Sequence, residues 1–453
     1  RGSWYGLFVP GANPPFLPTY HFFVSPADWA QMLENIVDGR SLGDAVLEKW
    51  NASVPALFAY GNDLYEVKLR YQGSQWHRAM GFDATAYFHC PGPQNMGGRG
   101  KVKLLSFRVE FPRYKQFQGK QAIVLNKIHH VTEKNLYYHG FQTIFGYRLF
   151  RIAGVPAPDS RLVHVFVNGC YYHLMAEVEL PGEEFVRRFF PGEGDLFKAL
   201  GCPRGISWAN CSGPYDWSDG RPLEARPPWS KEEVYSFNYD RKTRRFDGPS
   251  VLIDLIETLH SAAKISDEAL REVLSERFDV EEVLRYIACS NWGCAWDDAW
   301  QNYYLFYYHE DGKWRIFPWD MDQMFGGPCC CARVDPETSL WRGKEGDLDN
   351  WQPDPGKPVF NRLKNYFFRA FPEEYLFYLI ALNNEVFQPR ILFGWINGIE
   401  ATLQRVADLT PLPIEDSIEE YAQIIRDFVV AVSYTHLRAH ETRHDLVCRL
   451  LLE

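Results

Sequence analysis

The spacing of apolar residues divides the chain into a first part with the period of strands and a second part with the period of helices. Between residues 16 and 178, short runs rich in β-branched and aromatic residues alternate with turn residues, which is typical of strands. Two of these turns, Gly61-Asn62-Asp63 and Asn168-Gly169, have the composition of hairpin connections. The strands predicted on this basis are 16–24, 55–60, 64–71, 102–111, 119–126, 162–167 and 171–178.

Helices are expected at two places among these strands and throughout the last 200 residues. Ser25-Pro26 is a typical helix start, and Trp29 and Met32 follow it on one face. A second helix is predicted from 133 to 153, where a glycine and a proline follow. Beyond it, apolar residues with helical spacing predict helices at 251–259, 283–288, 358–371, 373–386, 391–408 and 417–430.

This order of elements indicates an α+β fold with a β-rich lobe followed by a helical lobe. We expect one domain over 16–431, with the β-rich lobe at about 16–200 and the helical lobe at about 251–431. Residues 201–250 show little period and are rich in Pro, Gly, Trp, Asp and Arg, so they are expected to form a lid or surface insert. A functional site is expected in the crevice between the two lobes.

Composition and charge exclude several classes of protein. The 453 residues are 46% hydrophobic and 23% charged, which is typical of a globular chain with ample core. The net charge of −10 argues against a nucleic-acid-binding surface, because phosphate neutralisation needs clustered Lys and Arg. No apolar run approaches the roughly 20 residues of a membrane span. Ten cysteines occur without zinc or redox spacing.

Both ends of the chain are unusual. The sequence starts at Arg1 without Met, so a preceding signal peptide would not be visible in it. The last residues, Val432 to Glu453, resemble a translated sequencing-adaptor read-through, and we expect them to be a non-native tail outside the domain.

The stretch 295–327 carries the strongest chemical signal. Two aromatic-rich runs, 303–308 and 314–319, are joined by a turn containing Asp-Gly, which predicts a tight hairpin. Asp297 and Asn302 precede this hairpin, and Asp320-Met321-Asp322 follows it. Carboxylate and amide oxygens at the two open ends of one hairpin suit Mg²⁺, which prefers oxygen ligands. The alternative is an edge hairpin with solvated acids at its ends.

Asp320 and Asp322 add a physical argument for a cation. If both stand on alternate positions of one strand, their carboxylates point to the same side and repel each other. A bound metal would relieve this repulsion, and so would simple exposure to water.

Several segments in order along the chain resemble the CotH kinase family. The most specific string is Asn-Tyr-Tyr-Leu-Phe at 302–306, followed by Gly-Lys-Trp at 312–314 and Pro-Trp-Asp-Met-Asp at 318–322. The other segments that carry the resemblance are 69–74, 106–111, 168–172 and 194–199. The resemblance covers about 17–430. It implies an atypical protein-kinase-like fold that transfers the γ-phosphate of ATP, with Mg²⁺, to Ser or Thr of a protein substrate.

The same resemblance implies roles for residues of the hairpin region. Asp297 matches the catalytic Asp, Asp320 the Mg²⁺-binding Asp and Asn302 the second metal ligand. The family usually has Asn-Trp-Asp shortly before its Asn, whereas Gly293 stands at the third position here. Asp297 and Asp298 are therefore both candidates for the base, although only Asp297 keeps the kinase spacing to Asn302.

Nucleotide-binding roles are implied less specifically. Trp314 resembles the ring that stacks on adenine, with Tyr171 or Tyr172 as the opposite wall; a hairpin Trp can equally be a core residue. The remaining candidates are Lys103 and Lys198 for the phosphates and Glu179 as the acid that pairs with such a lysine. Lys198 can also be a surface lysine and Glu179 a solvated acid. The Gly-rich segment 73–100 either covers phosphates or is a plain loop.

Two other functions stay open. CotH-like proteins also occur as surface adhesins without catalysis, and a kinase fold can perform another nucleotidyl or glutamyl transfer. The presence of the acids and the Asn favours the enzyme. The resemblance favours a secreted protein or one of the cell or spore surface.

Overall fold

The structure is a computed structural model that describes residues 17–35, 50–73, 82–83, 103–127, 130–131, 136–137, 139–200, 216–295, 298, 301–325, 361–409 and 418–450. The chain forms two compact units. Unit 1 comprises residues 1–144, 158–180 and 396–423, and unit 2 comprises residues 145–157, 181–395 and 424–453. Helices α3, α11 and α12 each contribute residues to both units.

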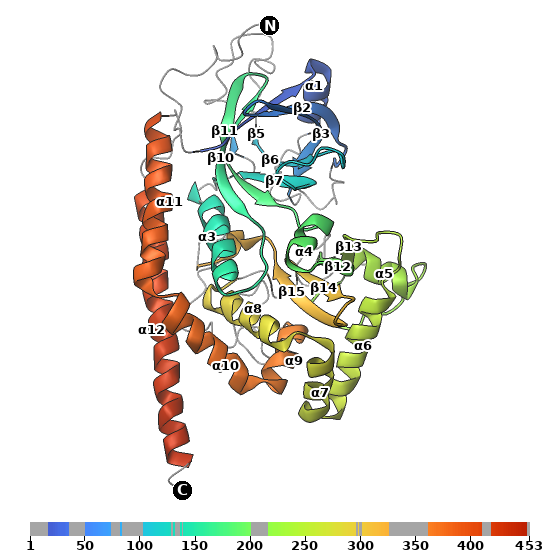
Figure 1. The fold of residues 1–453 in the computed structure, drawn as a ribbon, viewed down its shortest axis with the longest axis vertical. Coiled ribbons are helices and arrows are strands. Elements are labelled where there is room, and N and C mark those ends of the chain that lie inside the picture. Colours follow the sequence, from blue (N-terminus) through green and yellow to red (C-terminus); the bar gives the residue numbers. More distant parts are fainter. Residues whose placement is uncertain are drawn as a thin grey trace. The chain divides into compact units, whose positions relative to one another are not determined.

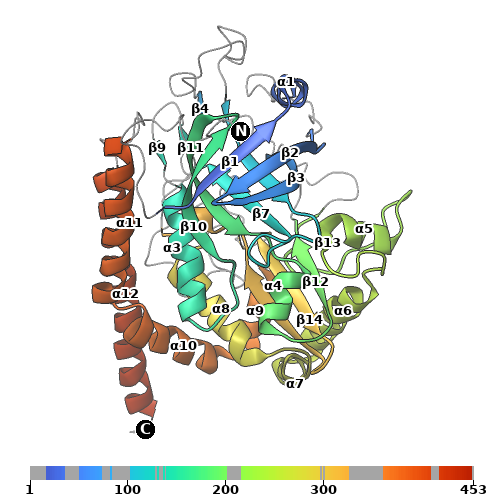
Figure 2. The same cartoon turned by 45° about the horizontal axis from the view of Figure 1, so that its top comes forward.

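Unit 1 is built on a closed barrel of strands in the order β1-β10-β11-β7-β6-β3-β2 (Figures 1 and 2). Its strands are β1 (Thr19–Val24), β2 (Val54–Tyr60), β3 (Asp63–Gln72), β6 (Ser106–Glu110), β7 (Ala122–Lys127), β10 (Ser160–Val167) and β11 (Cys170–Glu179). The pair β1–β10 is parallel, and the other neighbours are antiparallel. Alternate residues of each strand point into the barrel, where aromatic rings such as Tyr20, Phe22 and Phe58 are fully buried.

Both predicted hairpins of unit 1 are confirmed. The turn between β2 and β3 is Gly61-Asn62, and the turn between β10 and β11 is Asn168-Gly169. Asn168 and Gly169 have φ of +51° and +82°, as a two-residue hairpin turn of the Asn-Gly kind requires. The predicted strand 102–111 is broken at Leu105: β5 (Lys103–Leu104) pairs with β4 (Phe82–Asp83) in a separate two-stranded sheet.

The helix predicted after Ser25 is α1 (Pro26–Glu34), and the Oγ of Ser25 accepts the N–H of Asp28 at 3.1 Å. The helix predicted from 133 begins later, as α3 (His139–Ile152). The residues before it include β8 (His130–Val131) and β9 (Leu136–Tyr137), which pair with each other. Leu136 and Tyr137, which the apolar spacing assigned to the helix, therefore belong to a strand instead.

Unit 2 contains a four-stranded antiparallel sheet in the order β13-β12-β14-β15, together with helices. The strands are β12 (Gly194–Ala199), β13 (Tyr239–Arg241), β14 (Tyr303–Tyr308) and β15 (Lys313–Pro318). The helical elements are α4 (Glu183–Phe189), α5 (Lys231–Asn238), α6 (Ser250–Ile265), α7 (Asp267–Arg277), α8 (Val280–Trp292), α9 (Arg362–Ala370), α10 (Pro372–Ala381), the π-helical turn η7 (Leu382–Val386), α11 (Pro389–Leu409) and α12 (Ile418–Leu450).

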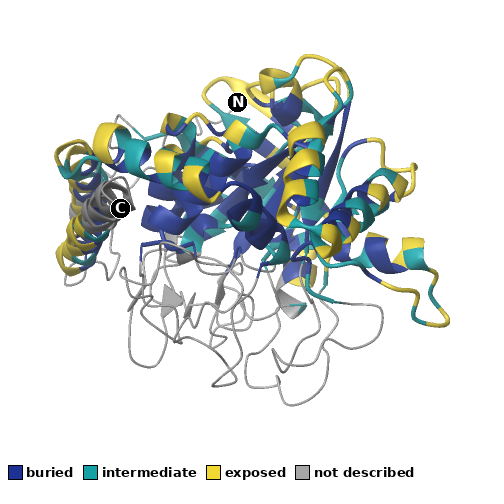
Figure 3. Ribbon diagram, turned by 90° about the horizontal axis from the view of Figure 1, so that it is seen from below, coloured by how far each residue is buried: buried dark blue, intermediate teal, exposed yellow. Residues whose placement is uncertain are grey.

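The predicted apolar faces of the first long helices are confirmed. Leu252, Leu255, Ile256 and Leu259 of α6 are buried, as are Val283, Leu284, Ile287 and Ala288 of α8. Figure 3 shows the resulting pattern, with one face of a helix buried and the opposite face exposed. No helix in the described part of the chain is long and apolar enough to cross a membrane.

The expected insert differs from the prediction over its second half. Residues 216–250 contain α5 and β13, and β13 extends the sheet of unit 2 by pairing with β12. Ser218 and Asp219 are fully buried. The sequence of residues 216–250 shows no clear period because one short helix and one very short strand contain too few repeats to form a pattern. Residues 201–215, and most of the Gly-rich segment 73–100, lie outside the described residues.

Candidate functional site

The open end of the β14–β15 hairpin brings together two of the predicted metal ligands. The last paired residues are Tyr303 and Pro318, and the N–H of Trp319 then donates to the carbonyl of Asn302 at 3.1 Å. Asn302 and Asp320 both have left-handed backbone, with φ of +63° and +57°. Asn and Asp adopt this conformation more readily than other side chains, yet it still costs free energy and is concentrated at functional sites. The carboxamide and the carboxylate thus belong to one fixed hairpin end.

The backbone of Asp320 is held from outside the hairpin. Its N–H donates to the hydroxyl of Tyr147 on α3 at 3.0 Å. Burial raises the pKa of the Tyr147 phenol well above its usual value, so the hydroxyl stays protonated beside Asp320. Sequence reasoning missed Tyr147, because nothing in its local spacing connects it with a residue 173 positions later.

One expectation about the acids is wrong. Strand β15 ends at Pro318, and Asp320 precedes a 3-10 turn, η5 (Met321–Gln323). Asp320 and Asp322 are therefore not on alternate positions of one strand, and the argument from side-by-side repulsion does not hold. The described residues contain no group of three His, Cys, Asp or Glu arranged to hold a metal ion.

Asp298 is buried, and both oxygens of its carboxylate accept hydrogen bonds. Both of its carboxylate oxygens accept from the ammonium of Lys364, at 2.9 and 2.7 Å. The hydroxyl of Ser290 also donates to this carboxylate, and that of Tyr286 does so at 3.3 Å. Asp297, the other candidate base, lies outside the described residues.

Lys198 and Trp314 also lie in unit 2. The ammonium of Lys198 stands 4.7 Å from the ring centroid of Trp319, the residue before Asp320. Trp314 is 1% exposed, and its ring packs against those of Tyr307 and Phe197 at centroid distances of 5.2 and 6.1 Å. This is the packing of a core ring, and a base could stack on Trp314 only if a neighbouring ring moved.

The four other candidates lie in unit 1. Tyr172 is buried, and its hydroxyl exchanges hydrogen bonds with the backbone of Leu105. Tyr171 is half-buried, and its hydroxyl oxygen lies 3.2 Å from Nδ1 of His164. Glu179 is buried and accepts the N–H of Asp159 at 3.2 Å. Lys103 belongs to β5, and its side chain lies outside the description.

A lysine–glutamate pair exists in the barrel, but it is not the predicted one. Lys120 Nζ lies 2.7 Å from Glu177 Oε1, and Arg161 Nε lies 2.8 Å from Oε2 of the same carboxylate. Burial alone would raise the pKa of Glu177, but the two cations lower it below its usual value. Sequence spacing does not separate the two acids, because Glu177 and Glu179 lie two residues apart on the same strand face and differ in their long-range partners.

The comparisons with known proteins identify the family. The family described as CotH kinase protein matches residues 98–435, most of the chain, and the protein belongs to this CotH kinase family. It is similar to the inner spore coat protein H of Bacillus subtilis strain 168, with 22% identity over 314 residues, which are 69% of this chain and 70% of that protein.

Two solved structures show a weak likeness. One is the Helicobacter pylori proinflammatory kinase CtkA, with 11% identity, a TM-score of 0.28, and coverage of 74% of this chain and 96% of that chain. The other is the HipA–HipB–operator DNA complex of Shewanella oneidensis MR-1, with 12% identity, a TM-score of 0.32, and coverage of 94% and 72%.

Proposed function

We propose that this protein is an ATP- and Mg²⁺-dependent protein kinase that transfers the γ-phosphate of ATP to Ser or Thr hydroxyls. The observation that carries the proposal is the hairpin end, where Asn302 and Asp320 share left-handed backbone and a hydrogen bond joins the two strands. Membership of the CotH kinase family supports the same reaction class. The proposed fold is protein-kinase-like, with the nucleotide in a cleft between a β-rich lobe and a helical lobe.

The donor set of the hairpin end fits Mg²⁺. Asn302 offers an amide oxygen and Asp320 a carboxylate, and Mg²⁺ bound in proteins commonly takes few such ligands and keeps waters and phosphate oxygens. Asp322 is half-buried two residues later and is the third candidate ligand. When bound, Mg²⁺ would supply neutralisation of the phosphate charge.

The protein's own residues would position the two substrates. Asp297 would orient the acceptor hydroxyl and take its proton, a role for which Asp298 is less suited because Lys364 occupies both of its oxygens. Lys198 would contact the phosphates, because its ammonium already lies against the residue next to Asp320.

The remaining assignments are proposals from the family resemblance. Trp314 and Tyr171 or Tyr172 would form the walls of the adenine site, and Lys103 with Glu179 would form an alternative phosphate contact. The acceptor would be a protein of the cell surface or spore coat, and the kinase itself secreted or surface-located. The similarity to an inner spore coat protein supports this location.

The test is an incubation of the full chain with Mg²⁺ and ATP labelled in either the γ- or the α-phosphate. Protein labelling from γ-labelled ATP alone is expected for a kinase. Labelling from α-labelled ATP would indicate nucleotidyl transfer instead, and no labelling with either would favour a non-catalytic surface protein. Asp320→Asn should abolish the signal, whereas Asp254→Asn, which removes an exposed acid of α6, should not.

A further inference from the structure

A buried ion pair connects α9 with the segment that leads into the central hairpin. Lys364 and Asp298 have side-chain exposures of 4% and 0%. Burying two charges costs much desolvation free energy, so such a pair contributes less to stability than apolar packing of the same volume would. Stability alone therefore does not account for this pair.

The ammonium of Lys364 joins three parts of unit 2. Besides the Asp298 carboxylate, it donates to the hydroxyl of Ser290 at 2.9 Å and to the amide oxygen of Asn291 at 3.4 Å, both on α8. These contacts use the donor capacity of the ammonium completely. Asp298 is thus fixed against α8 and α9 together.

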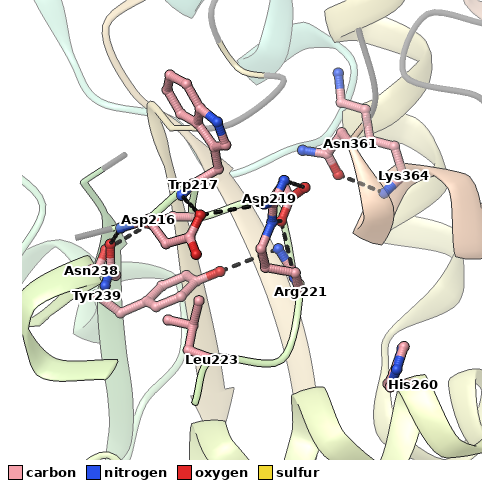
Figure 4. Close-up of polar contacts among 12 residues, drawn as sticks. Asp216, Trp217, Asp219, Arg221, Leu223, Asn238, Tyr239, His260, Asn361 and Lys364 are labelled. Carbon is pink, nitrogen blue, oxygen red and sulfur yellow. Dashed lines mark hydrogen bonds and ion pairs between the residues drawn. The ribbon is translucent and has the colours of Figure 1, made fainter. Parts of the chain in front are cut away.

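The first turn of α9 also holds the backbone around this segment. Asn361 accepts the N–H of Lys364 at 2.8 Å as the helix cap and donates its own amide to the carbonyl of Asp298 at 3.3 Å. Leu363, the residue before Lys364 in this turn, donates its N–H to the carbonyl of Asp219 at 2.9 Å. Figure 4 shows Asn361 and Lys364 next to Asp219.

Residues 218–219, which the first turn of α9 contacts through Leu363, also contact the residue that follows Asn302. The hydroxyl of Tyr303, the residue after Asn302, donates to the carbonyl of Ser218, which precedes Asp219. Both ends of the segment 298–303 are therefore fixed to the first turn of α9, one end through Lys364 and Asn361 and the other through residues 218–219.

We propose that Lys364 is a positioning residue for phosphoryl transfer: it fixes Asp298, which lies four residues before Asn302, and so helps to hold Asn302 in place. This rests on the proposed function, because it gives Lys364 a part in that reaction. Lys364 touches neither ATP nor acceptor. It acts by keeping Asn302 in place relative to Asp320. Small displacements of such groups cost large factors in rate.

The test uses Lys364→Met, Lys364→Arg and the double variant Asp298→Asn with Lys364→Met, which removes both charges at similar volume. Lys231→Met is the matched control, because it breaks an ion pair between α5 and α6 that does not touch the segment. Each variant is measured for melting temperature, ATP affinity with Mg²⁺, single-turnover transfer, and hydrogen exchange of a peptide covering 298–304.

Lys364→Met should lower the transfer rate about 10–100-fold, the usual effect of losing an outer supporting residue. ATP affinity with Mg²⁺ should fall by a smaller factor than the transfer rate, because the variant displaces Asn302 but leaves the other proposed Mg²⁺ ligand, Asp320, in place. The peptide 298–304 should exchange faster. Lys364→Arg should keep most of the rate, and the double variant should regain melting temperature but neither rate nor protection.

Wild-type transfer in the double variant, or unchanged exchange of 298–304 in Lys364→Met, would overturn the positioning role. Lack of transfer in the wild type would refute the proposed function itself. In that case the exchange measurement still decides whether Lys364 holds the segment, so the two failures are distinguishable.

Discussion

Asp297 and Asp320 should divide the work of the reaction between acceptor and nucleotide. Asp320→Asn removes the carboxylate at the hairpin end, so it should abolish Mg²⁺-dependent ATP binding together with transfer. Asp297→Asn should leave ATP affinity nearly unchanged and cut transfer by about two or more orders of magnitude, the scale of acid–base and positioning groups. Calorimetric titration of ATP and a transfer assay measure both effects. Equal loss of ATP binding in the two variants would refute this division.

Asp298→Asn belongs in the same series, because sequence spacing alone does not distinguish the two neighbouring acids. It leaves Lys364 as a buried cation without its charged partner, so it should lower the melting temperature, and it should also slow transfer because it weakens the anchor formed by Lys364 and Asp298. ATP affinity of the folded protein should stay close to that of the wild type.

Trp314→Ala separates adenine stacking from core packing. If adenine stacks on this ring, the variant should lose about 1–3 kcal/mol of ATP binding while staying folded, by analogy with base–aromatic stacking. If the ring is core, as its 1% exposure suggests, the variant should lose about 3–5 kcal/mol of stability and bind ATP normally in the folded fraction. Chemical denaturation and ATP titration of the same preparation distinguish these outcomes.

Glu282 should make the stability of the protein depend on pH. Burial raises its pKa to about 8, although Arg315 lies 3.7 Å from its Oε2. Between about pH 4.5 and 8 the folded protein holds a proton that the unfolded chain has released, so stability falls as pH rises through this window. One group contributes a slope of at most about 1.4 kcal/mol per pH unit.

Glu282→Gln should remove this decline, and the melting temperature measured from pH 5 to 9 should then vary less than in the wild type. Glu281→Gln is the control, because Glu281 is the exposed neighbour on the same helix. A wild-type melting temperature that is flat between pH 5 and 8 would contradict the raised pKa.

Residue roles were predictable only where local spacing carries them. The chain order of Asn302, hairpin and Asp320 is visible in the sequence, because a short turn must bring the two ends together. Tyr147, Lys364 and the pair Lys120–Glu177 were not found, because each acts through a partner far along the chain. Trp314 is the opposite case: it belongs to a recognisable motif, but the motif does not reveal how deeply its ring is buried.

The turn after Asp320 depends on close packing between elements. A Cβ on Gly146 of α3 would stand 2.7 Å from Sδ of Met324 and 3.0 Å from Cβ of Met321. Met321 and Met324 are both buried. Their packing against Gly146 holds η5 in place, and with it the position of Asp320.

Gly146→Ala should therefore displace η5, lower stability by about 1–3 kcal/mol as overpacking does, and weaken ATP binding. Gly394→Ala is a matched helical control: its Cβ meets nothing within 4 Å, and the change should stabilise α11 by about 0.5–1 kcal/mol. Melting curves and ATP titrations of both variants provide the measurement. Normal ATP affinity in Gly146→Ala would show that η5 does not position Asp320.

Elements with many repeats of their period were predicted well, and short ones were not. The sequence predicted the hairpins of the barrel and of the central sheet, and the apolar faces of α6 and α8. In each case several residues at regular spacing indicate the same buried face. The strands β5, β8, β9 and β13 have two or three residues each and offer no period. They depend on pairing partners, which local spacing does not specify.

At the level of the complete chain, the sequence indicated strands first and helices later, and the structure has a barrel in unit 1 and a mainly helical unit 2. Closure of the barrel was not predictable, because it depends on the parallel pairing of β1 with β10, which lie far apart in sequence. The division of α3, α11 and α12 between the two units was not predictable from the sequence either.

The C-terminal helix provides a test of where the native chain ends. The expected tail begins at Val432, yet α12 continues to Leu450, Val432 is fully buried, and the carbonyl of Ser433 accepts from Asn383 at 3.3 Å. The match to the CotH kinase family also extends to residue 435. The boundary of the non-native tail stays a prediction, and two positions for it can be compared: Val432, as expected from the sequence, and His436, the residue after the end of the family match.

Deletion of 436–453 should leave melting temperature and ATP binding unchanged, because residues without an evolved partner surface contribute no packing. Deletion of 432–453 should instead cost about 1.5–3 kcal/mol, the value of one buried Val side chain, because it removes Val432 from its site. The two truncations differ by only four residues, so differential scanning of both against the full chain separates the alternatives directly. A large loss of stability in the shorter deletion would show that the helix beyond Thr435 is native structure.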